Sequence, residues 1–132
     1  MSQTQKEIFE RYLSAGAIRR DPDAVAALFT DDGVYEAPLV PPGHPLPRRL
    51  AGREEIRSGI GVYHRYPAFE VTVDFERSGY VLHDTADPDV FVVEIDTVLV
   101  TPQGERTTMS LVQIFRVRDG LIVQLRDYFA PS

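Results

Sequence analysis

The chain has 132 residues, the usual length of one domain, and a domain of this size buries enough apolar surface to fold without disulfides. It has no cysteine, which excludes thiol catalysis and zinc–thiolate sites, and its net charge of −6 with scattered basic residues disfavours nucleic-acid binding. From this length we expect a single domain over residues 1–132. Because we find no signal peptide and no apolar run of about 20 residues, we expect it in the cytoplasm and away from membranes.

The first part of the chain predicts two helices. Thr4 and Glu7 form a capping box, and apolar side chains then recur at helical spacing, which predicts a helix over residues 5–17. Asp21 and Pro22 are typical of an N-cap followed by proline at the first helical position, so we expect a second, short helix to begin there.

A third helix is predicted over residues 52–63, although Gly59 and Gly61 lower its helix propensity. Before it, residues 34–37 predict a short strand. Residues 38–47 contain five prolines, which favours an extended loop between that strand and the third helix.

After residue 66 the apolar period changes from helical spacing to strict alternation, which is typical of half-buried strands. Phe69, Val71, Val73 and Phe75, for example, alternate with polar side chains. The first predicted strand covers residues 69–76 and extends to residue 82. The others cover residues 90–101, 107–117 and 121–129. They predict a long antiparallel sheet in the second half of the chain.

The register of the last hairpin decides which side chains share a face of that sheet. A two-residue turn at Asp119 and Gly120 would pair Arg118 with Leu121 and mix polar and apolar side chains. A three-residue loop would pair Val117 with Leu121 and separate them better, so we expect the second register. One face then carries Met109, Leu111, Gln113, Phe115, Val117, Leu121, Val123, Leu125, Asp127 and Phe129.

The opposite, convex face of the hairpin carries its own apolar patch. This patch consists of Val112, Ile114, Ile122 and Tyr128, and arginines lie along its edge. Because an exposed apolar patch usually marks an interface, we expect a homodimer through the convex face.

Four polar side chains occupy predicted apolar rows. Gln113 and Asp127 lie on the most apolar face of the hairpin, and Glu94 and Asp96 lie in a row of valines. A buried carboxylate is costly unless it is paired, protonated or functional. The simpler interpretations are that Glu94 and Asp96 face solvent on an edge strand, and that Asp127 pairs with an arginine.

Other catalytic arrangements find little support. The three histidines are not at metal-ligand spacing, and no nucleophile elbow or phosphate-binding glycine loop is present. We therefore expect no cofactor and no metal. One alternative stays open: Glu94, Asp96 and Asp127 are hard-ion ligands that could hold a divalent metal.

Several motifs resemble the SnoaL-like group of the nuclear-transport-factor-2-like cone fold, over nearly the whole chain. They are residues 27–33 before the first strand, Gly52-Arg53 at the third helix, residues 115–122, and the ending Arg126-Asp127-Tyr128-Phe129. The resemblance implies an α+β fold in which three N-terminal helices pack on a strongly curved antiparallel sheet.

The resemblance also implies site residues. In SnoaL-like polyketide cyclases the catalytic base lies at the position of Asp127. Limonene-epoxide hydrolases share the same ending; their catalytic aspartates match Asp96 and Asp127, and their water-binding tyrosine matches Tyr35. Their asparagine and arginine fall on Ala37 and Glu94, so this chain departs from their full set.

Ketosteroid isomerases are similar at a different subset of positions. They share the tyrosine at Tyr12. Their catalytic base falls on Ala37 and their oxyanion-hole acid on Gln113, so the resemblance does not carry over the isomerase mechanism.

Together these features predict a small-molecule enzyme with carboxylate general acid/base chemistry in an enclosed apolar pocket, of the cyclase, isomerase or hydrolase type. Asp127 would be the base and Asp96 the acid, with Glu94 coupled to Asp96 and Tyr35 positioning the reacting atom. The alternative is a non-catalytic module of the same fold for ligand binding or dimerisation. We expect a small apolar or aromatic organic ligand in a pocket lined by Tyr12, Phe29, Tyr63, Met109, Leu111, Gln113 and Phe115.

Overall fold

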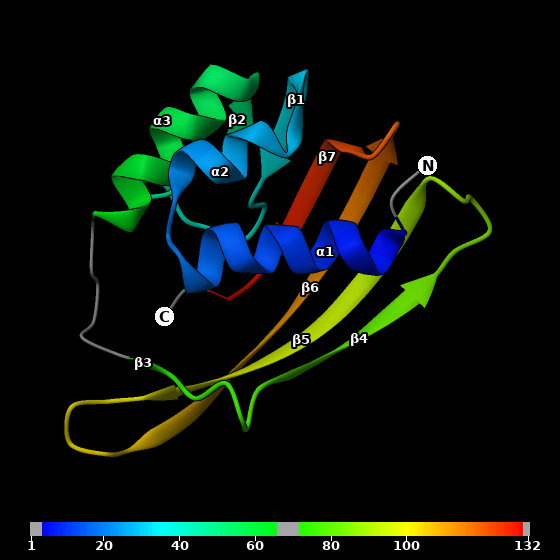
Figure 1. Cartoon of the computed structure of the whole chain (residues 1–132). Coiled ribbons are helices and arrows are strands. Elements are labelled where there is room, and N and C mark those ends of the chain that lie inside the picture. Colours follow the sequence, from blue (N-terminus) through cyan, green and yellow to red (C-terminus); the bar gives the residue numbers. More distant parts are fainter. Residues whose placement is uncertain (1–3, 66–71, 131–132) are drawn as a thin grey trace.

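Helices lie on the concave side of a bent, seven-stranded sheet in the computed structural model, which describes residues 4–65 and 72–130 (Figure 1). The helical elements are α1 (Gln5–Leu13), a π-helical turn η1 (Ser14–Ile18), α2 (Pro22–Ala27) and α3 (Arg53–His64). The strands are β1 (Phe29–Glu36), β2 (Arg49–Ala51), β3 (Thr72–Val73), β4 (Gly79–Asp84), β5 (Val90–Val100), β6 (Arg106–Arg118) and β7 (Leu121–Tyr128). The predicted α+β class is confirmed. None of the helices among the described residues is long and apolar enough to cross a bilayer.

The predicted helix caps are present. The Thr4 hydroxyl accepts a hydrogen bond from the Glu7 amide at 3.2 Å, and the Asp21 carboxylate accepts one from the Ala24 amide at 3.1 Å. Each bond satisfies an amide that the first turn of a helix leaves without a partner. The first helix is α-helical only to Leu13 and then widens into the π-helical turn, so its predicted end at residue 17 is four residues too late for an α-helix.

Close packing against β2 explains one of the two glycines in α3. A Cβ atom at Gly59 would lie 2.6 Å from the side chain of Leu50, which is buried against this face of the helix. Leu50 belongs to β2, a strand that the sequence did not predict. With only three residues, β2 is too short to show the alternation that identifies strands.

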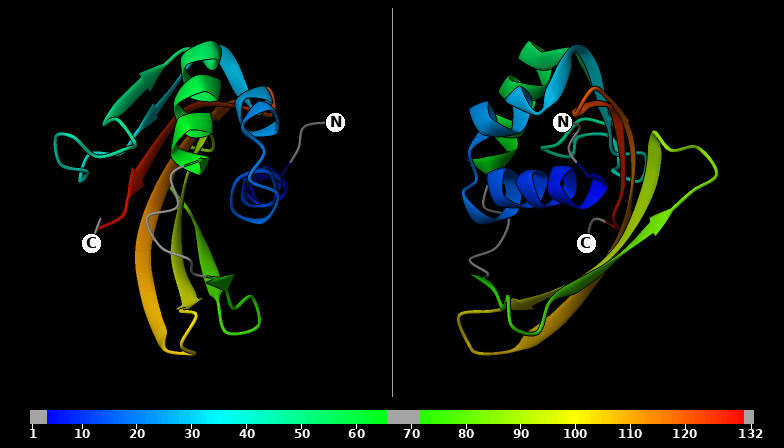
Figure 2. Two further views of the ribbon diagram at one scale, coloured as in Figure 1. Left: turned by 90° about the vertical axis from the view of Figure 1, so that its left-hand side faces the viewer. Right: turned by 45° about the vertical axis from the view of Figure 1, so that its right-hand side comes forward.

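The strand order is β2-β1-β7-β6-β5-β3, and β4 also pairs with β5. All pairs are antiparallel except β1 with β7, which run parallel with Tyr35 opposite Leu125. The views in Figure 2 show that the sheet curves around the helices, and that the far ends of β5 and β6 extend beyond them. The helices therefore cover the inner face of the sheet at one end only.

The predicted strand over residues 69–76 is only partly present. Residues 66–71 lie outside the described part of the chain, β3 contains two residues, and a turn follows it. Phe75 lies in that turn and is 55% exposed, so its predicted place in an apolar row is wrong.

The last hairpin turns differently from the prediction. Asp119 and Gly120 both have positive φ, and Arg118 pairs with Leu121, so the turn has two residues and the predicted three-residue loop is wrong. Asp-Gly is a preferred sequence for such a turn. A bulge between the pairs Arg116–Gln124 and Val117–Ile122 then shifts the register by one residue.

This bulge restores the predicted faces over most of the hairpin. Gln113 lies opposite Asp127, and Phe115 lies opposite Leu125, all on the inner face. Ile122, however, lies between the turn and the bulge, where it pairs with Val117 of the inner face, and it is fully buried. It therefore belongs to the core and not to the convex patch.

Aromatic rings fill the core under α1. Phe91 and Phe115 stack with ring centroids 4.8 Å apart, and Phe9 of α1 meets Phe115 edge-on at 5.9 Å. All three side chains are fully buried. This cluster fixes α1 against β5 and β6, immediately beside the polar pair formed by Gln113 and Asp127.

Candidate functional site

A buried carboxylate lies on the inner face of the sheet. Asp127 of β7 is 7% exposed and lies directly opposite Gln113 of β6, which is 6% exposed. The Tyr35 hydroxyl donates a hydrogen bond to Asp127 Oδ2 at 2.6 Å, and Gln113 Nε2 donates one to Oδ1 at 3.2 Å. Three neighbouring strands thus hold the carboxylate in one orientation.

The parallel pairing of β1 with β7 makes the bond from Tyr35 available. Tyr35 lies opposite Leu125, two residues before Asp127, so both side chains point to the same face. The Tyr35 ring is buried, and its hydroxyl is the group that reaches the carboxylate.

Burial raises the pKa of Asp127 from 3.8 to about 6, while the hydrogen bonds from Tyr35 and Gln113 act in the opposite direction. Among the described residues, no arginine or lysine forms an ion pair with this carboxylate. Asp127 is therefore ionised at neutral pH but close to its pKa, which is the condition that general-base catalysis requires.

Three tyrosines lie within the influence of this charge. Burial, and then the charge of Asp127, raise the pKa of Tyr12, Tyr35 and Tyr63. Each hydroxyl therefore stays protonated at neutral pH and is able to donate a hydrogen bond. Tyr12 comes from α1 and packs edge-on against Phe115, with 5.6 Å between ring centroids, while Tyr63 comes from α3.

Glu94 and Asp96 do not belong to this site. Val93 lies opposite Gln113, so the alternation of β5 directs its neighbour Glu94 to the outer face, with Asp96 two residues further. Both side chains are exposed: Glu94 lies 2.7 Å from His83 Nε2, and Asp96 accepts a hydrogen bond from Ser110 at 2.6 Å.

The prediction that these two acids share the inner surface with Asp127 is therefore wrong. The row of Phe91, Val93 and Ile95 contains the larger apolar side chains, and it is this row that packs inward. A single metal ion cannot contact carboxylates on both faces of a sheet, so the alternative of a three-carboxylate metal site fails. Among the described residues, no other group of three such ligands is close enough to bind one ion.

The predicted pocket residues fall into three groups. Gln113, Tyr12 and Tyr63 lie around Asp127, as the hydrogen bond and the pKa shifts above indicate. Leu111 and Met109 follow on the same face, opposite Ile95 and Thr97, and are half-buried.

The other two predicted pocket residues are core residues. Phe115 is enclosed by the aromatic cluster. Phe29 is fully buried opposite Ile122, five residues along β7 from Asp127, which corresponds to roughly 16 Å of strand. Phe115 still lies on the inner face next to the pair of Gln113 and Asp127, whereas Phe29 is remote from that pair along β7.

Sequence reasoning missed one residue beside this region. The His44 ring lies 6.1 Å from the Tyr63 ring and 6.4 Å from the Phe129 ring, and its Nδ1 accepts a hydrogen bond from the Leu46 amide at 3.0 Å. A single histidine in a proline-rich loop gives no sequence signal for such a position, because its neighbours come from distant parts of the chain.

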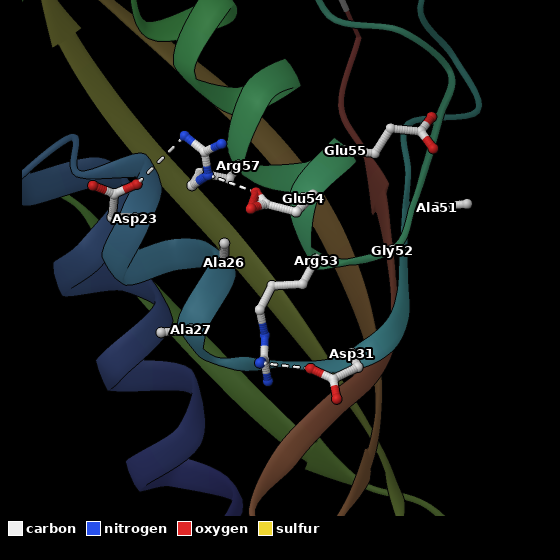
Figure 3. A pocket seen from close by; sticks show the side chains of 10 residues that line it. All are labelled: Asp23, Ala26, Ala27, Asp31, Ala51, Gly52, Arg53, Glu54, Glu55 and Arg57. Carbon is white, nitrogen blue, oxygen red and sulfur yellow. Dashed lines mark hydrogen bonds and ion pairs between the residues drawn. The ribbon is translucent and has the colours of Figure 1, made fainter.

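Two pockets formed by described residues lie elsewhere. The larger, of about 730 Å³, is a surface groove between α2 and the beginning of α3 (Figure 3). Its arginines are paired with acids: Arg53 with Asp31 at 2.7 Å and Arg57 with Glu54 at 2.8 Å. A second groove, of about 410 Å³, lies along α1 and η1. Asp127 lines neither.

Comparison with known proteins assigns the family. Residues 9–125 match the model of the SnoaL-like domain. The chain belongs to the SnoaL-like domain family. The resemblance noted from the sequence motifs is thereby confirmed, and known structures of the nuclear-transport-factor-2-like fold share this architecture.

One curated protein and one solved structure illustrate the similarity of this SnoaL-like domain to known proteins. Over 105 residues it is 31% identical to an uncharacterised PhzA/B-like protein of Pseudomonas aeruginosa, covering 79% of this chain and 69% of that protein. A candidate isomerase from Bacillus subtilis has a TM-score of 0.75 at 23% identity, covering 96% of this chain and 86% of its own.

Two further solved structures are similar. An LEH-like epoxide hydrolase of Mycobacterium tuberculosis has a TM-score of 0.58 at 26% identity, covering 93% of this chain and 80% of its own. A protein of ketosteroid-isomerase-like fold from Catenulispora acidiphila, solved with trimethylamine, has a TM-score of 0.64 at 21% identity, covering 98% and 89%. Likeness at these identities establishes the shared fold and leaves the reaction to the residues of the site.

Proposed function

We propose that this SnoaL-like domain is a small-molecule enzyme in which the Asp127 carboxylate acts as a general base, in a reaction of the cyclase, isomerase or hydrolase type. The observation that carries the proposal is a buried carboxylate with no cationic partner among the described residues, oriented by two hydrogen bonds, and with a pKa of about 6. A carboxylate used only for structure would be expected to have a cationic partner.

The chemistry follows from the arrangement. Asp127 takes a proton from a carbon acid or from water, and the Tyr35 hydroxyl holds the carboxylate in place. Tyr12 and Tyr63 remain protonated and supply neutral donors near any negative charge that develops on the ligand. Glu94 and Asp96 have no part in this scheme because they lie on the other face of the sheet.

The second candidate function is a non-catalytic module for ligand binding or dimerisation. It is favoured by the packing beside Asp127, where Phe9, Phe91 and Phe115 occupy the interior and the two pockets described above lie elsewhere. Crystals soaked with small aromatic molecules distinguish the two functions. A ligand with a carbon acid or electrophilic carbon beside Asp127 supports the enzyme. An interior that stays closed to all of them supports a non-catalytic module that dimerises or binds a ligand elsewhere.

Removal of the Tyr35 hydroxyl tests its role as partner of the base. The hydrogen bond from Tyr35 lowers the pKa of Asp127, so Tyr35→Phe should raise that pKa above about 6. The change is measured by following the side-chain carboxyl ¹³C resonance of Asp127 as a function of pH. Tyr128→Phe on the outer face is the matched control and should leave the titration unchanged. An unaltered pKa in Tyr35→Phe would show that the bond contributes nothing to the base.

We also propose that the domain forms a homodimer through the outer face of the sheet. Val112, Ile114 and Tyr128 lie there and are half-buried within one chain, whereas Ile122 is withdrawn into the core. Sedimentation at micromolar concentration should give a dimer, and Ile114→Asp should shift it toward monomer because the charge would be desolvated in the interface. Phe75→Asp, in an exposed turn, is the control and should remain dimeric. A monomeric wild type would rule this assembly out.

A further inference from the structure

One buried acceptor in the site has no partner among the described residues. Gln113 Oε1 is inaccessible to solvent, yet it accepts no hydrogen bond from any of the described residues. Gln113 itself is 6% exposed and lies at the centre of the inner face, between Val93 of β5 and Asp127 of β7. Buried polar groups are nearly always paired, so the partner of this oxygen is expected to come from outside the described residues, as an ordered water or a ligand.

The orientation of the Gln113 amide is fixed by its neighbour. Nε2 donates to Asp127 Oδ1 at 3.2 Å. Reversing the amide would place its carbonyl oxygen against a carboxylate, two acceptors facing each other with no proton between them. Oε1 must therefore point away from Asp127, and it is available only to a donor that arrives from outside.

We infer that the site around Asp127 takes an organic molecule that carries an O–H or N–H donor and presents it to Gln113 Oε1. The inference rests on the proposed function in that it places the ligand beside Asp127. It makes Gln113 a specificity-determining residue: it accepts from the ligand on one side and donates to Asp127 on the other.

The same contacts argue against anionic ligands. Asp127 contributes a negative charge with no paired cation among the described residues, and the Tyr35 hydroxyl already donates its proton to Asp127. A carboxylate or phosphate would meet like charge and a further acceptor in a buried setting. A neutral ligand with an apolar or aromatic body suits the surrounding rings.

We place the approach of the ligand along the inner face. Leu111 and Met109 continue the row that contains Gln113, and both side chains are half-buried. A molecule resting on Leu111 would bring its polar group to Gln113, the next residue inward on that face.

Three probes of similar size test the inference: benzyl alcohol, which has a donor; benzyl methyl ether, which lacks it; and benzoate, which is an anion. Binding is followed through the side-chain amide resonances of Gln113, identified by their loss in Gln113→Met, and through backbone amides of β6 and β7. In the wild type, the alcohol should bind about tenfold more tightly than the ether, because one buried acceptor gains a hydrogen bond, and benzoate should bind most weakly.

Two variants remove the acceptor by different routes. In Gln113→Met the preference for the alcohol over the ether should disappear. In Asp127→Asn the Tyr35 hydroxyl still donates to the side-chain oxygen, so the new amide nitrogen faces Gln113. The Gln113 amide then reverses, and Oε1 accepts from that nitrogen. Oε1 is thereby occupied, and the preference should be lost there too, although residue 113 is still glutamine.

The results separate this inference from the proposed function. Equal binding of the alcohol and the ether to the wild type, tighter binding of benzoate, or no binding of any probe would overturn the inference. If that occurs while Asp127 titrates with a pKa of about 6, the general base stands without this ligand class. A preference for the alcohol combined with an ordinary pKa of Asp127 would instead uphold the inference and remove the base.

Discussion

Asp127→Asn is expected to stabilise the protein increasingly as the pH rises, and to abolish turnover of whatever substrate is identified. The folded-state pKa of Asp127 is raised from 3.8 to about 6, so the wild type is favoured most below pH 3.8 and loses stability as the pH rises through 6. This rise of about two in the pKa corresponds to roughly 3 kcal/mol in the free energy of unfolding, about half of which is lost between pH 5 and pH 8.

The neutral amide avoids this loss because it can satisfy the same partners. Its oxygen accepts from the Tyr35 hydroxyl, and its nitrogen donates to Gln113 once that amide has reversed. Thermal or urea unfolding of both proteins at pH 5 and pH 8 measures the difference, which should grow with pH in favour of Asp127→Asn.

Asp96→Asn is the matched control for this comparison. Asp96 is exposed on the opposite face, so its replacement should change the free energy of unfolding by less than about 0.5 kcal/mol at either pH. If Asp127→Asn instead destabilises the fold by several kcal/mol at both pH values, the carboxylate has a structural role, and the binding module becomes the better function.

Phe115→Ala should lower the free energy of unfolding by roughly 3–5 kcal/mol, the largest effect expected for a substitution of one side chain here. The Phe115 ring is fully buried and packs against Phe91, Phe9 and Tyr12. Its removal leaves a cavity between α1 and the sheet that these rigid neighbours cannot easily fill. Urea unfolding measures the loss.

Phe75→Ala is the control for that experiment, because the Phe75 ring is 55% exposed in a turn. It should change the free energy of unfolding by about 0.5 kcal/mol or less. A loss below about 1 kcal/mol for Phe115→Ala would mean that the ring is not packed as described, and would place it in an open pocket instead.

Local signals predicted most of the fold. The capping box at Thr4 and the N-cap at Asp21 depend on neighbouring residues, and the helices they predicted are present apart from their ends. Of the strand predicted over residues 69–76, the structure describes only Thr72 and Val73 as strand. The family motifs then supplied the arrangement of helices on a curved sheet. The strand β2 and the parallel pairing of β1 with β7 were not predicted, because both depend on contacts between distant segments.

The site was predicted where a polar residue interrupts an apolar face. Gln113 and Asp127 showed this anomaly and are both buried. The same reasoning failed at Glu94 and Asp96, because an alternating strand has two candidate inner rows, and only the packing of the sheet decides between them. The bond from Tyr35 to Asp127 spans 92 residues, and spacing along the chain gives no indication of it.

The ionisation of Asp127 can be measured directly by a carboxyl ¹³C titration of the wild type, with the resonance identified by its absence in Asp127→Asn. If the carboxylate is a buried base without a cationic partner, its pKa should be about 6. A pKa below about 4 would mean that a cation or stronger donors hold the group ionised, and would contradict its assignment as the general base.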